Sequence, residues 1–372
     1  MALTSDVAVI GAGIIGLSTA YQLAQQGSTV TVYETGTPGF GQSAGQSRIF
    51  RHAHDDPRLV ELAVRARAHW RRWEDELGAP LVSGDGGLAL GDTAVRRLPA
   101  MQQYSEIGAR EIDSDELHSL LPQLADYDGP AVFDPAAGSI HTRTAIELLS
   151  QSLGDRVVRE QVISLRSVDD SVQVRCPTLV GDHGAAVVCA GRGTAALARS
   201  VGIEIPVQLG AHVRVSFAVR DSSIGRLPTL QDGSGQFGFS GIYAAAYPDR
   251  SAYGLGLSDS VDADSDGTIV DGDTLARFAH DARAYVSRAL PGFDSTPTGI
   301  VHCWVTTLPW ATTASGFGRT DRSWQSPDTT CSSTHRRSAR HSRLPSTWAR
   351  SPLRSPLPTS WVRRRADRET SG

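Results

Sequence analysis

The stretch Asp6-Val-Ala-Val-Ile10-Gly11-Ala-Gly13-Ile-Ile-Gly16 decides the fold, because a short apolar run leads into a glycine turn and then into a helix. Residues 6–10 are typical of a buried strand, and residues 17–26 have the apolar spacing of a helix. Gly27 predicts the end of that helix, and residues 29–33 predict a second strand that ends at Glu34. The sequence therefore predicts a βαβ unit around a GxGxxG turn.

Each part of this unit suits a dinucleotide. The first glycine permits the tight turn, the second lets a pyrophosphate approach the backbone, and the third allows close packing of helix on strand. The helix N-terminus offers free N–H groups and a positive dipole to phosphates, and Glu34, 23 positions after Gly11, can accept both ribose hydroxyls. A chance glycine turn in another α/β fold is the alternative. The predicted cofactor-binding residues of the unit are Gly11, Gly13, Ile14, Ile15, Gly16 and Glu34.

Further elements suggest a second domain inserted into the first. Helices are predicted over residues 57–77, 144–153 and 273–290, strands over 172–175 and 185–190, and a β-rich segment over 206–257. A chain of 372 residues has room for two domains. The pattern predicts a nucleotide-binding fold interrupted by an antiparallel-sheet domain.

Composition and termini exclude several classes of protein. With 40% hydrophobic and 20% charged residues, the chain is neither disordered nor a disulfide-rich scaffold. No apolar stretch approaches the roughly 18 residues that a membrane span needs, and no signal peptide is seen. Four cysteines without a CxxC pair favour reduced thiols over disulfides or a zinc site. We therefore expect a cytoplasmic protein with no metal site.

The net charge of -4 conceals an uneven distribution. All 36 basic residues are Arg, and residues 311–372 carry +8 while residues 1–310 carry -12. That segment holds 21 Ser or Thr and one β-branched aliphatic residue, Val362, so it cannot bury a core and is predicted to be unstructured. The alternative is a basic arm for nucleic acid or anionic lipid. Because it lacks interleaved aromatic residues or an amphipathic helix, we expect no nucleic-acid or membrane partner.

The stretch Gly41-Gln-Ser-Ala-Gly-Gln-Ser-Arg48-Ile-Phe-Arg51-His-Ala-His54 carries a resemblance to a known family. It resembles the flavin-contacting loop of D-amino-acid-oxidase-like FAD-dependent oxidoreductases, and its G-x-S-R-x-x-R-H-A-H part resembles the monomeric sarcosine oxidase and N-methyltryptophan oxidase branch. Segments 133–140, 187–191 and 205–207 resemble later motifs of that family in the same order. The resemblance covers residues 1 to about 310.

The resemblance implies a Rossmann-like FAD-binding domain of the GR2 type, interleaved with a mixed or antiparallel β-sheet substrate domain. It places residues 1–80 and 140–205 in the FAD-binding domain, with a remnant around 300–310. It places residues 81–139 and 206–299 in the substrate-binding domain.

The resemblance also implies site residues. It places Arg48 beside the flavin and gives Arg51 the substrate carboxylate, which a guanidinium can clamp with two hydrogen bonds. It places Cys303 at the C-x-x-T cysteine whose sulfur is bonded to the flavin 8-methyl group. The alternatives are ion pairs for the two arginines and a small buried hydrophobe for Cys303. Tyr243 completes the catalytic set, and the remaining implied FAD contacts are Ser43, Val162 and Gly191.

His52 and His54 are expected to pack around this site rather than to act as bases. The segment Tyr253-Gly-Leu-Gly256-Leu departs from the family, since the family's G-L-K-L-G has a lysine over the flavin where this chain has Gly256. Negative charge on oxygen then lacks its usual stabilisation, so either oxygen reduction is slow or the electron acceptor differs.

The chain also lacks the family's A-G-x-x-x-x-F-K segment. Read one base out of frame, the codons of Trp310–Asp321 permit G-D-D-G-F-G-V-W-E-D, and those of Ser326–Ala339 permit A-G-H-N-L-F-K-H-A-P-A-L-G. We therefore hypothesise a frameshift near Trp310, which makes residues 311–372 an out-of-frame tail.

The expected function is FAD-dependent oxidation of a carboxylate-bearing secondary amine, either an N-methyl amino acid or a cyclic imino acid. Hydride passes to flavin N5, and molecular oxygen or another acceptor takes the electrons. Two alternatives stay open: an inactive flavoprotein remnant with a truncated FAD site, and a non-enzymatic dinucleotide-binding module.

Overall fold

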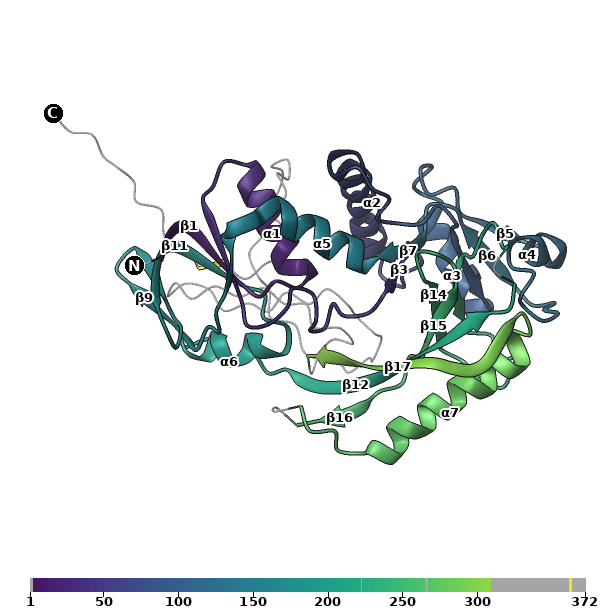
Figure 1. The fold of residues 1–372 in the computed structure, drawn as a ribbon. Helices are drawn as coiled ribbons and strands as arrows, with labels where there is room; N and C mark the ends of the chain where they lie inside the picture. The colour runs from purple at the N-terminus through teal and green to yellow at the C-terminus, as the bar shows by residue number, and fades with distance from the viewer. Residues whose placement is uncertain (1–2, 222, 265–266, 309–360, 363–372) are drawn as a thin grey trace, which may run out of the picture.

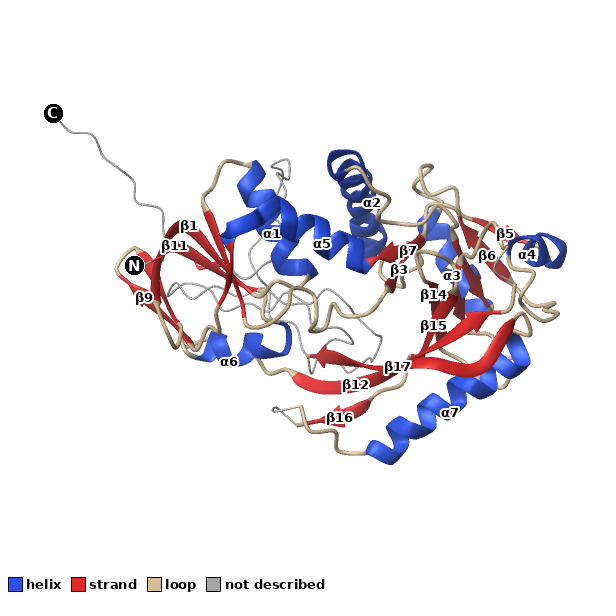
Figure 2. Cartoon of the chain, viewed as in Figure 1, coloured by secondary structure: helices blue, strands red, loops and turns tan. Residues whose placement is uncertain are grey.

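The computed structural model, which describes residues 3–221, 223–264, 267–308 and 361–362, contains two large sheets at opposite ends of the molecule (Figure 1). Helices pack against both sheets (Figure 2). The helices are α1 (Ile14–Gln25), α2 (Pro57–Leu77), α3 (Asp92–Met101), α4 (Ser114–Leu120), α5 (Thr142–Leu153), α6 (Thr194–Arg199) and α7 (Gly272–Ala289), with 3-10 turns η1 (Gly154–Arg156) and η2 (Gly191–Gly193).

The seven-stranded sheet contains the predicted βαβ unit, and its main path runs β8-β2-β1-β11-β10-β9. The strands from β8 to β11 are parallel, and β10 and β9 extend the sheet antiparallel. The strands are β1 (Leu3–Ile10), β2 (Val30–Glu34), β8 (Val157–Arg159), β9 (Ser164–Val168), β10 (Ser171–Arg175), β11 (Val180–Val188) and β18 (Trp361–Val362), the last of which pairs with β11.

The central strands of this sheet are buried on both faces, as parallel strands are. On one face, Val9 and Val187 pack with α1 and α5, which lie side by side in Figure 1. On the other face, Ile10 and Tyr33 pack with Leu197 of α6 and with side chains of β9 and β10. This double coverage explains why residues 7–10 and 185–190 are apolar throughout.

The nine-stranded sheet buries one face against α7. Alternate residues of its strands, such as Val213, Leu255 and Ala244, face that helix, as the two-residue strand period requires. Its path is β16-β12-β15-β14-β13-β4-β6-β5, with β17 also paired to β12. The strands are β4 (Gly87–Leu90), β5 (Arg110–Ile112), β6 (Ala131–Asp134), β12 (Gln208–Val219), β13 (Thr229–Asp232), β14 (Ile242–Ala246), β15 (Ala252–Leu257), β16 (Val261–Ala263) and β17 (Phe293–Thr307).

A small antiparallel ribbon, β3 (Ser47–Phe50) paired with β7 (Gly138–His141), connects the two sheets. The Ser47 hydroxyl donates to the backbone carbonyl of Ala245 in β14 at 3.2 Å. In the loop before β3, the side-chain amide of Gln42 donates to the carbonyl of Trp304 in β17 at 3.1 Å. The segment that carries the family resemblance therefore lies against the nine-stranded sheet.

The predicted fold class is confirmed, and helix 57–77 has the predicted bounds. Helix α5 begins two residues before the predicted Thr144, and α7 is displaced by one residue from the predicted 273–290. Residues 300–307, expected as a remnant of the FAD-binding domain, form the second half of β17 in the nine-stranded sheet. The expectation of an unstructured, out-of-frame segment 311–372 lies outside the described residues, except for Trp361–Val362, which form β18.

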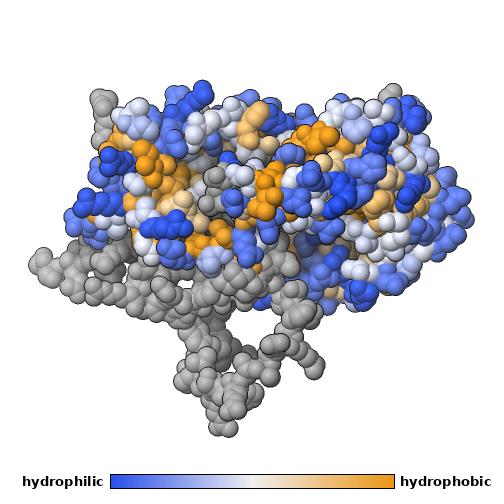
Figure 3. Space-filling model, turned by 90° about the horizontal axis from the view of Figure 1, so that it is seen from below, coloured by the Kyte–Doolittle hydropathy of each residue, from blue (hydrophilic) through white to orange (hydrophobic). Residues whose placement is uncertain are grey.

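Exposed apolar side chains are scattered over the described surface. Seen from below, orange apolar patches alternate with hydrophilic ones (Figure 3). The most exposed large apolar residues include Ile15, Phe40 and Ile300. Among the described residues, no helix combines the length and apolar character that crossing a membrane requires.

A buried hydrogen bond anchors α7 to the nine-stranded sheet, and its loss should destabilise the fold. The Tyr285 hydroxyl donates to Asp232 Oδ2 at 2.9 Å, and both residues are almost fully buried. We expect Tyr285→Phe to lower the free energy of unfolding by about 1–3 kcal/mol, because a buried carboxylate oxygen loses a donor. The measurement is the urea midpoint. Tyr104→Phe, at a half-buried tyrosine, is the control, and equal midpoints for both variants would contradict the assignment.

Candidate functional site

The glycine turn between β1 and α1 is sterically restricted to glycine. Gly11 has a φ of +102°, and a Cβ there would lie 2.5 Å from the carbonyl oxygen of Cys189. At Gly16 a Cβ would overlap the carbonyl of Gly11. Helix α1 begins at Ile14; its N-cap residue, Gly13, has no side chain to cap it, and its first turn has no acidic residue. The positive end of the helix dipole is therefore not neutralised by α1 itself, which suits a phosphate.

Two further predicted cofactor residues contact this turn. Both oxygens of Glu34 accept backbone N–H groups, from Ala12 at 2.7 Å and from Gly36 at 2.9 Å. The Ser43 hydroxyl accepts the N–H of Ile14 at 3.0 Å. The structure thus brings the end of β2 and the 41–46 loop to the start of α1.

Of the other predicted cofactor residues, Gly191 and Ile14 lie near the glycine turn, and Val162 does not. Gly191 follows β11 with a φ of +54°, and a Cβ there would lie 2.5 Å from the Gln42 side-chain oxygen. Ile14 packs on the core between α1 and the sheet, whereas Ile15 is 58% exposed. Val162 packs on the opposite face of the sheet, with the cluster around Tyr33.

Arg48 fixes the 41–46 loop. Its guanidinium donates to the carbonyls of Ser47 at 2.9 Å and Gln42 at 3.4 Å, and to that of Ala44. Its Nη2 also lies 4.0 Å from the Sγ of Cys303, which is half-buried on β17. The structure therefore brings together two residues that are 255 positions apart in the sequence.

Tyr243 lies in a row of residues on the sheet face that points away from α7. In this row, Tyr243 of β14 is paired with Gly256 of β15 on one side and with Gln231 of β13 on the other. Arg214 of β12 is paired with Gly256 in turn, so the side chains of the row share one face. Burial raises the pKa of Tyr243, while the charges of Arg214 and Arg48 oppose the shift. Tyr243 is therefore a neutral hydroxyl near physiological pH.

Arg51 lies farther along the same sheet face, beside a narrow cavity. No ion pair of Arg51 is seen among the described residues. Burial lowers its pKa to about 10; Arg97 adds to the shift and Asp55 opposes it, so the guanidinium remains charged at neutral pH. The cavity is lined by Arg51, Ala53, Gly87, Leu88, Ala89, Met101, Val132, Asp134, Ala137, Thr229 and Gln231.

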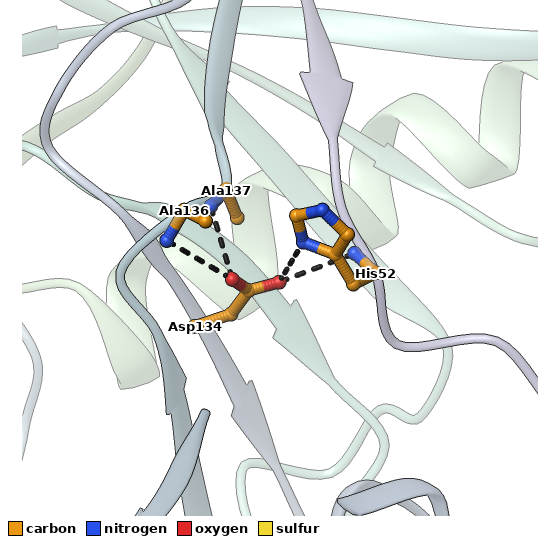
Figure 4. Close-up of polar contacts among 4 residues, drawn as sticks. All are labelled: His52, Asp134, Ala136 and Ala137. Atoms are coloured by element: carbon orange, nitrogen blue, oxygen red, sulfur yellow. Dashed lines mark hydrogen bonds and ion pairs between the residues drawn. The ribbon is translucent and has the colours of Figure 1, made fainter. Parts of the chain in front are cut away.

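A buried histidine–carboxylate pair positions the segment that carries Arg51 (Figure 4). Asp134 of β6 accepts from the backbone N–H of His52 at 3.1 Å and contacts its Nδ1 at 2.9 Å. The other oxygen of Asp134 accepts the N–H groups of Ala136 and Ala137 at 3.1 and 3.0 Å. Burial, followed by the charges of Arg51 and Arg97, lowers the pKa of His54 to about 4, so this side chain is neutral at pH 7.

Sequence reasoning did not identify four residues of this site: Asp134, Arg214, Thr229 and Gln231. Arg214 had a detectable signal, since it stands between two apolar residues in the run Val213-Arg-Val215 of a predicted β-rich segment. Thr229 and Gln231 had no detectable sequence signal, because only the pairing of β13 with β4 places them in the same cavity as Arg51. Among the described residues, no group of three or more His, Cys, Asp and Glu side chains is arranged to hold a metal ion.

The His52–Asp134 pair yields a prediction about stability. Asp134→Asn should lower the free energy of unfolding by about 1–3 kcal/mol, because an amide offers one acceptor oxygen to donors that now occupy both carboxylate oxygens. Urea unfolding checks this, with the exposed Asp128→Asn as the matched control. If both variants kept the wild-type midpoint, the pair would not hold the Arg51 segment.

Comparison with known proteins agrees with this arrangement. The sequence matches the family model described as FAD dependent oxidoreductase over residues 6–337, a range that extends past Trp310. It is 26% identical to the monomeric sarcosine oxidase of Bacillus sp. (strain B-0618) over an alignment of 220 residues that covers 55% of each chain. It is 29% identical to 4-methylaminobutanoate oxidase (formaldehyde-forming) of Paenarthrobacter nicotinovorans over 60% of this chain and 29% of that protein. The chain thus spans about half the length, or less, of these curated relatives.

Solved structures show the same fold at low identity. The open form of NikD, an unusual amino acid oxidase essential for nikkomycin biosynthesis, has a TM-score of 0.71 at 20% identity, covering 86% of this chain and 85% of that one. L-proline dehydrogenase from P. horikoshii has a TM-score of 0.73 at 18% identity, covering 86% of both chains. With a glycine turn that suits a dinucleotide, a matching fold and a family match over most of its length, this chain belongs to the FAD-dependent oxidoreductase family.

Proposed function

We propose that this protein oxidises a carboxylate-bearing secondary amine, an N-methyl amino acid or a cyclic imino acid, to the imine. Family membership supports the cofactor, and the curated relatives include sarcosine oxidases and a 4-methylaminobutanoate oxidase. The observation that carries the substrate class is Arg51, a half-buried, charged guanidinium without an ion-pair partner among the described residues, which lines a narrow cavity. Such a group binds a carboxylate.

The residues present fit FAD. The cradle at Gly11 and Gly16 leaves no space for a Cβ, and α1 presents its N-terminus there without a capping side chain of its own. Gly11, Gly13 and the first turn of α1 would hold the pyrophosphate, and Glu34 the ribose. The 41–46 loop and Cys303 would border the flavin. When bound, FAD accepts a hydride from the carbon next to the amine nitrogen.

The chain's own residues then bind and orient the amine. Arg51 holds the carboxylate, with Thr229 and Gln231 as polar neighbours in the cavity. Tyr243 offers a neutral hydroxyl on the same sheet face, two strands from β4. The His52–Asp134 pair keeps the Arg51 segment in register with β6. The side chains therefore contribute to amine oxidation by positioning the substrate and by electrostatic stabilisation. The released imine hydrolyses in water.

Removing the Arg51 charge tests the substrate class. We expect Arg51→Gln to lower kcat/KM for sarcosine or L-proline by roughly 100- to 1000-fold, since a buried charged contact is lost. Turnover of the decarboxylated analogues dimethylamine and pyrrolidine should change less than about 3-fold, because they make no carboxylate contact. The control is Arg96→Gln, at an exposed arginine of α3. Equal losses for both substrate types would contradict the assignment of Arg51.

Cys303 yields a second test. We propose that its thiol, on the sheet face beside Arg48, forms the thioether that the family resemblance implies. Acid precipitation of purified protein should leave the yellow colour in the pellet for the wild type and for Cys176→Ala, and release it from Cys303→Ala. The readout is absorbance near 450 nm. Flavin in the wild-type supernatant would contradict the tether while leaving the amine oxidation untouched.

A further inference from the structure

Arg214 is a buried cation that the family resemblance does not assign. It lies on β12 with 8% of its surface exposed. Its Nη1 donates to the carbonyl of Ser47 at 2.7 Å, and its Nη2 to that of Gly254 at 3.0 Å. Its Nε is buried and has no hydrogen-bond partner among the described residues. Burial of an unsatisfied charged donor is costly, so this N–H is suited to a ligand atom.

A second cation lies beside it. Arg48 donates to the same Ser47 carbonyl at 2.9 Å, so one oxygen accepts from both guanidiniums. Burial, followed by the charge of Arg48, lowers the pKa of Arg214. No carboxylate forms an ion pair with either arginine in the described part of the chain. An anion placed here would relieve the repulsion between two like charges.

Arg214 lies across the sheet from the position where the family resemblance predicts a lysine side chain. Gly256 is its direct partner across the sheet, and the resemblance predicts a lysine at that position. A Cβ at Gly256 would lie 2.5 Å from the Tyr243 ring and hydroxyl, and one at Gly254 would lie 2.9 Å from Arg214 Nη2. The two glycines therefore make room for Arg214 and Tyr243, and the charge on this sheet face comes from the neighbouring strand.

The hydrogen bonds indicate which anion fits. Because each terminal nitrogen of Arg214 already serves a backbone carbonyl, the free Nε suits a single oxygen atom, with the Tyr243 hydroxyl as a nearby donor. Arg51, in contrast, has no carboxylate partner in the described ranges, so its guanidinium can bind a carboxylate with two parallel hydrogen bonds. A small anion rather than a second carboxylate therefore matches Arg214.

We propose that Arg214, with Arg48 and Tyr243, forms a small-anion site that stabilises the negative charge on dioxygen as it is reduced. This inference rests on the proposed function. Dioxygen takes two electrons and two protons, the electrons from the reduced cofactor, and becomes hydrogen peroxide, so negative charge is present on oxygen before the protons arrive. A fixed buried cation lowers the free energy of that charge. In this proposal Gly256 does not leave oxygen without a stabilising cation, because Arg214 of β12 supplies the charge.

The test separates the oxygen step from amine oxidation. Purified holoprotein is reduced with dithionite under nitrogen and mixed with oxygenated buffer in a stopped-flow spectrometer. We expect Arg214→Met to slow reoxidation roughly 10- to 100-fold, Arg214→Lys to restore the rate to within about 5-fold of wild type, and Arg166→Met, at an exposed arginine of β9, to leave it unchanged. An unchanged rate in Arg214→Met, or a wild type that does not react with oxygen, overturns the proposal.

A second readout requires no turnover. Chloride titration of the oxidised protein, followed by the visible spectrum, should show binding weakened by at least about 10-fold in Arg214→Met and retained in Arg214→Lys, because the anion loses a charged donor. Absence of a chloride effect in the wild type overturns the small-anion site. Failure of amines to reduce the flavin would overturn the proposed function alone, whereas a protein that retains no flavin would overturn both.

Discussion

The carbonyl oxygen of Ser47 joins the two halves of the site. It accepts hydrogen bonds from Arg48, which lies on the β3–β7 ribbon between the two sheets, and from Arg214, which lies in the nine-stranded sheet. The Ser47 hydroxyl adds a bond to β14. These contacts fix the distance between the 41–46 loop and the polar face of the nine-stranded sheet. Because both donors are charged and largely shielded from water, the connection is strong and its geometry is restricted.

The polar face of the nine-stranded sheet follows from strand alternation. One set of alternate residues packs on α7, so the other set must face the ribbon and the loop. That set contains Arg214, Tyr243 and Gln231 in a single row across four strands. The row lies opposite Arg51, whose segment the His52–Asp134 pair attaches to β6. Arg51, the proposed ligand of the substrate carboxylate, and Arg214, the proposed ligand of a small anion, thus lie on the same face of the sheet.

Local sequence patterns were sufficient to predict the βαβ unit around the glycine turn and the helix at residues 57–77. The spacing around Gly11 and Gly16 predicts strand, turn and helix because steric restriction acts within a few residues, and helix 57–77 has its own start and stop signals in Pro57 and Gly78. The pairing of Arg214 with Gly256, and of Tyr243 with Gln231, could not be predicted. Those contacts depend on strand register between segments far apart in the chain, which leaves no local signal. The pairing of residues 300–307 with β12 left no local signal for the same reason, since β17 continues along β12 as one strand.

A crystal structure of the full chain with FAD and an unreactive sulfur analogue of an N-methyl amino acid would show whether Arg51 binds the carboxylate and Arg214 a small anion. We expect the analogue's carboxylate on the Arg51 guanidinium, within hydrogen-bond distance, and an ordered chloride or water on the Arg214 Nε between Arg48 and Tyr243. An analogue bound away from Arg51, or a flavin that does not border the sheet face with Cys303 and Tyr243, would contradict this expectation.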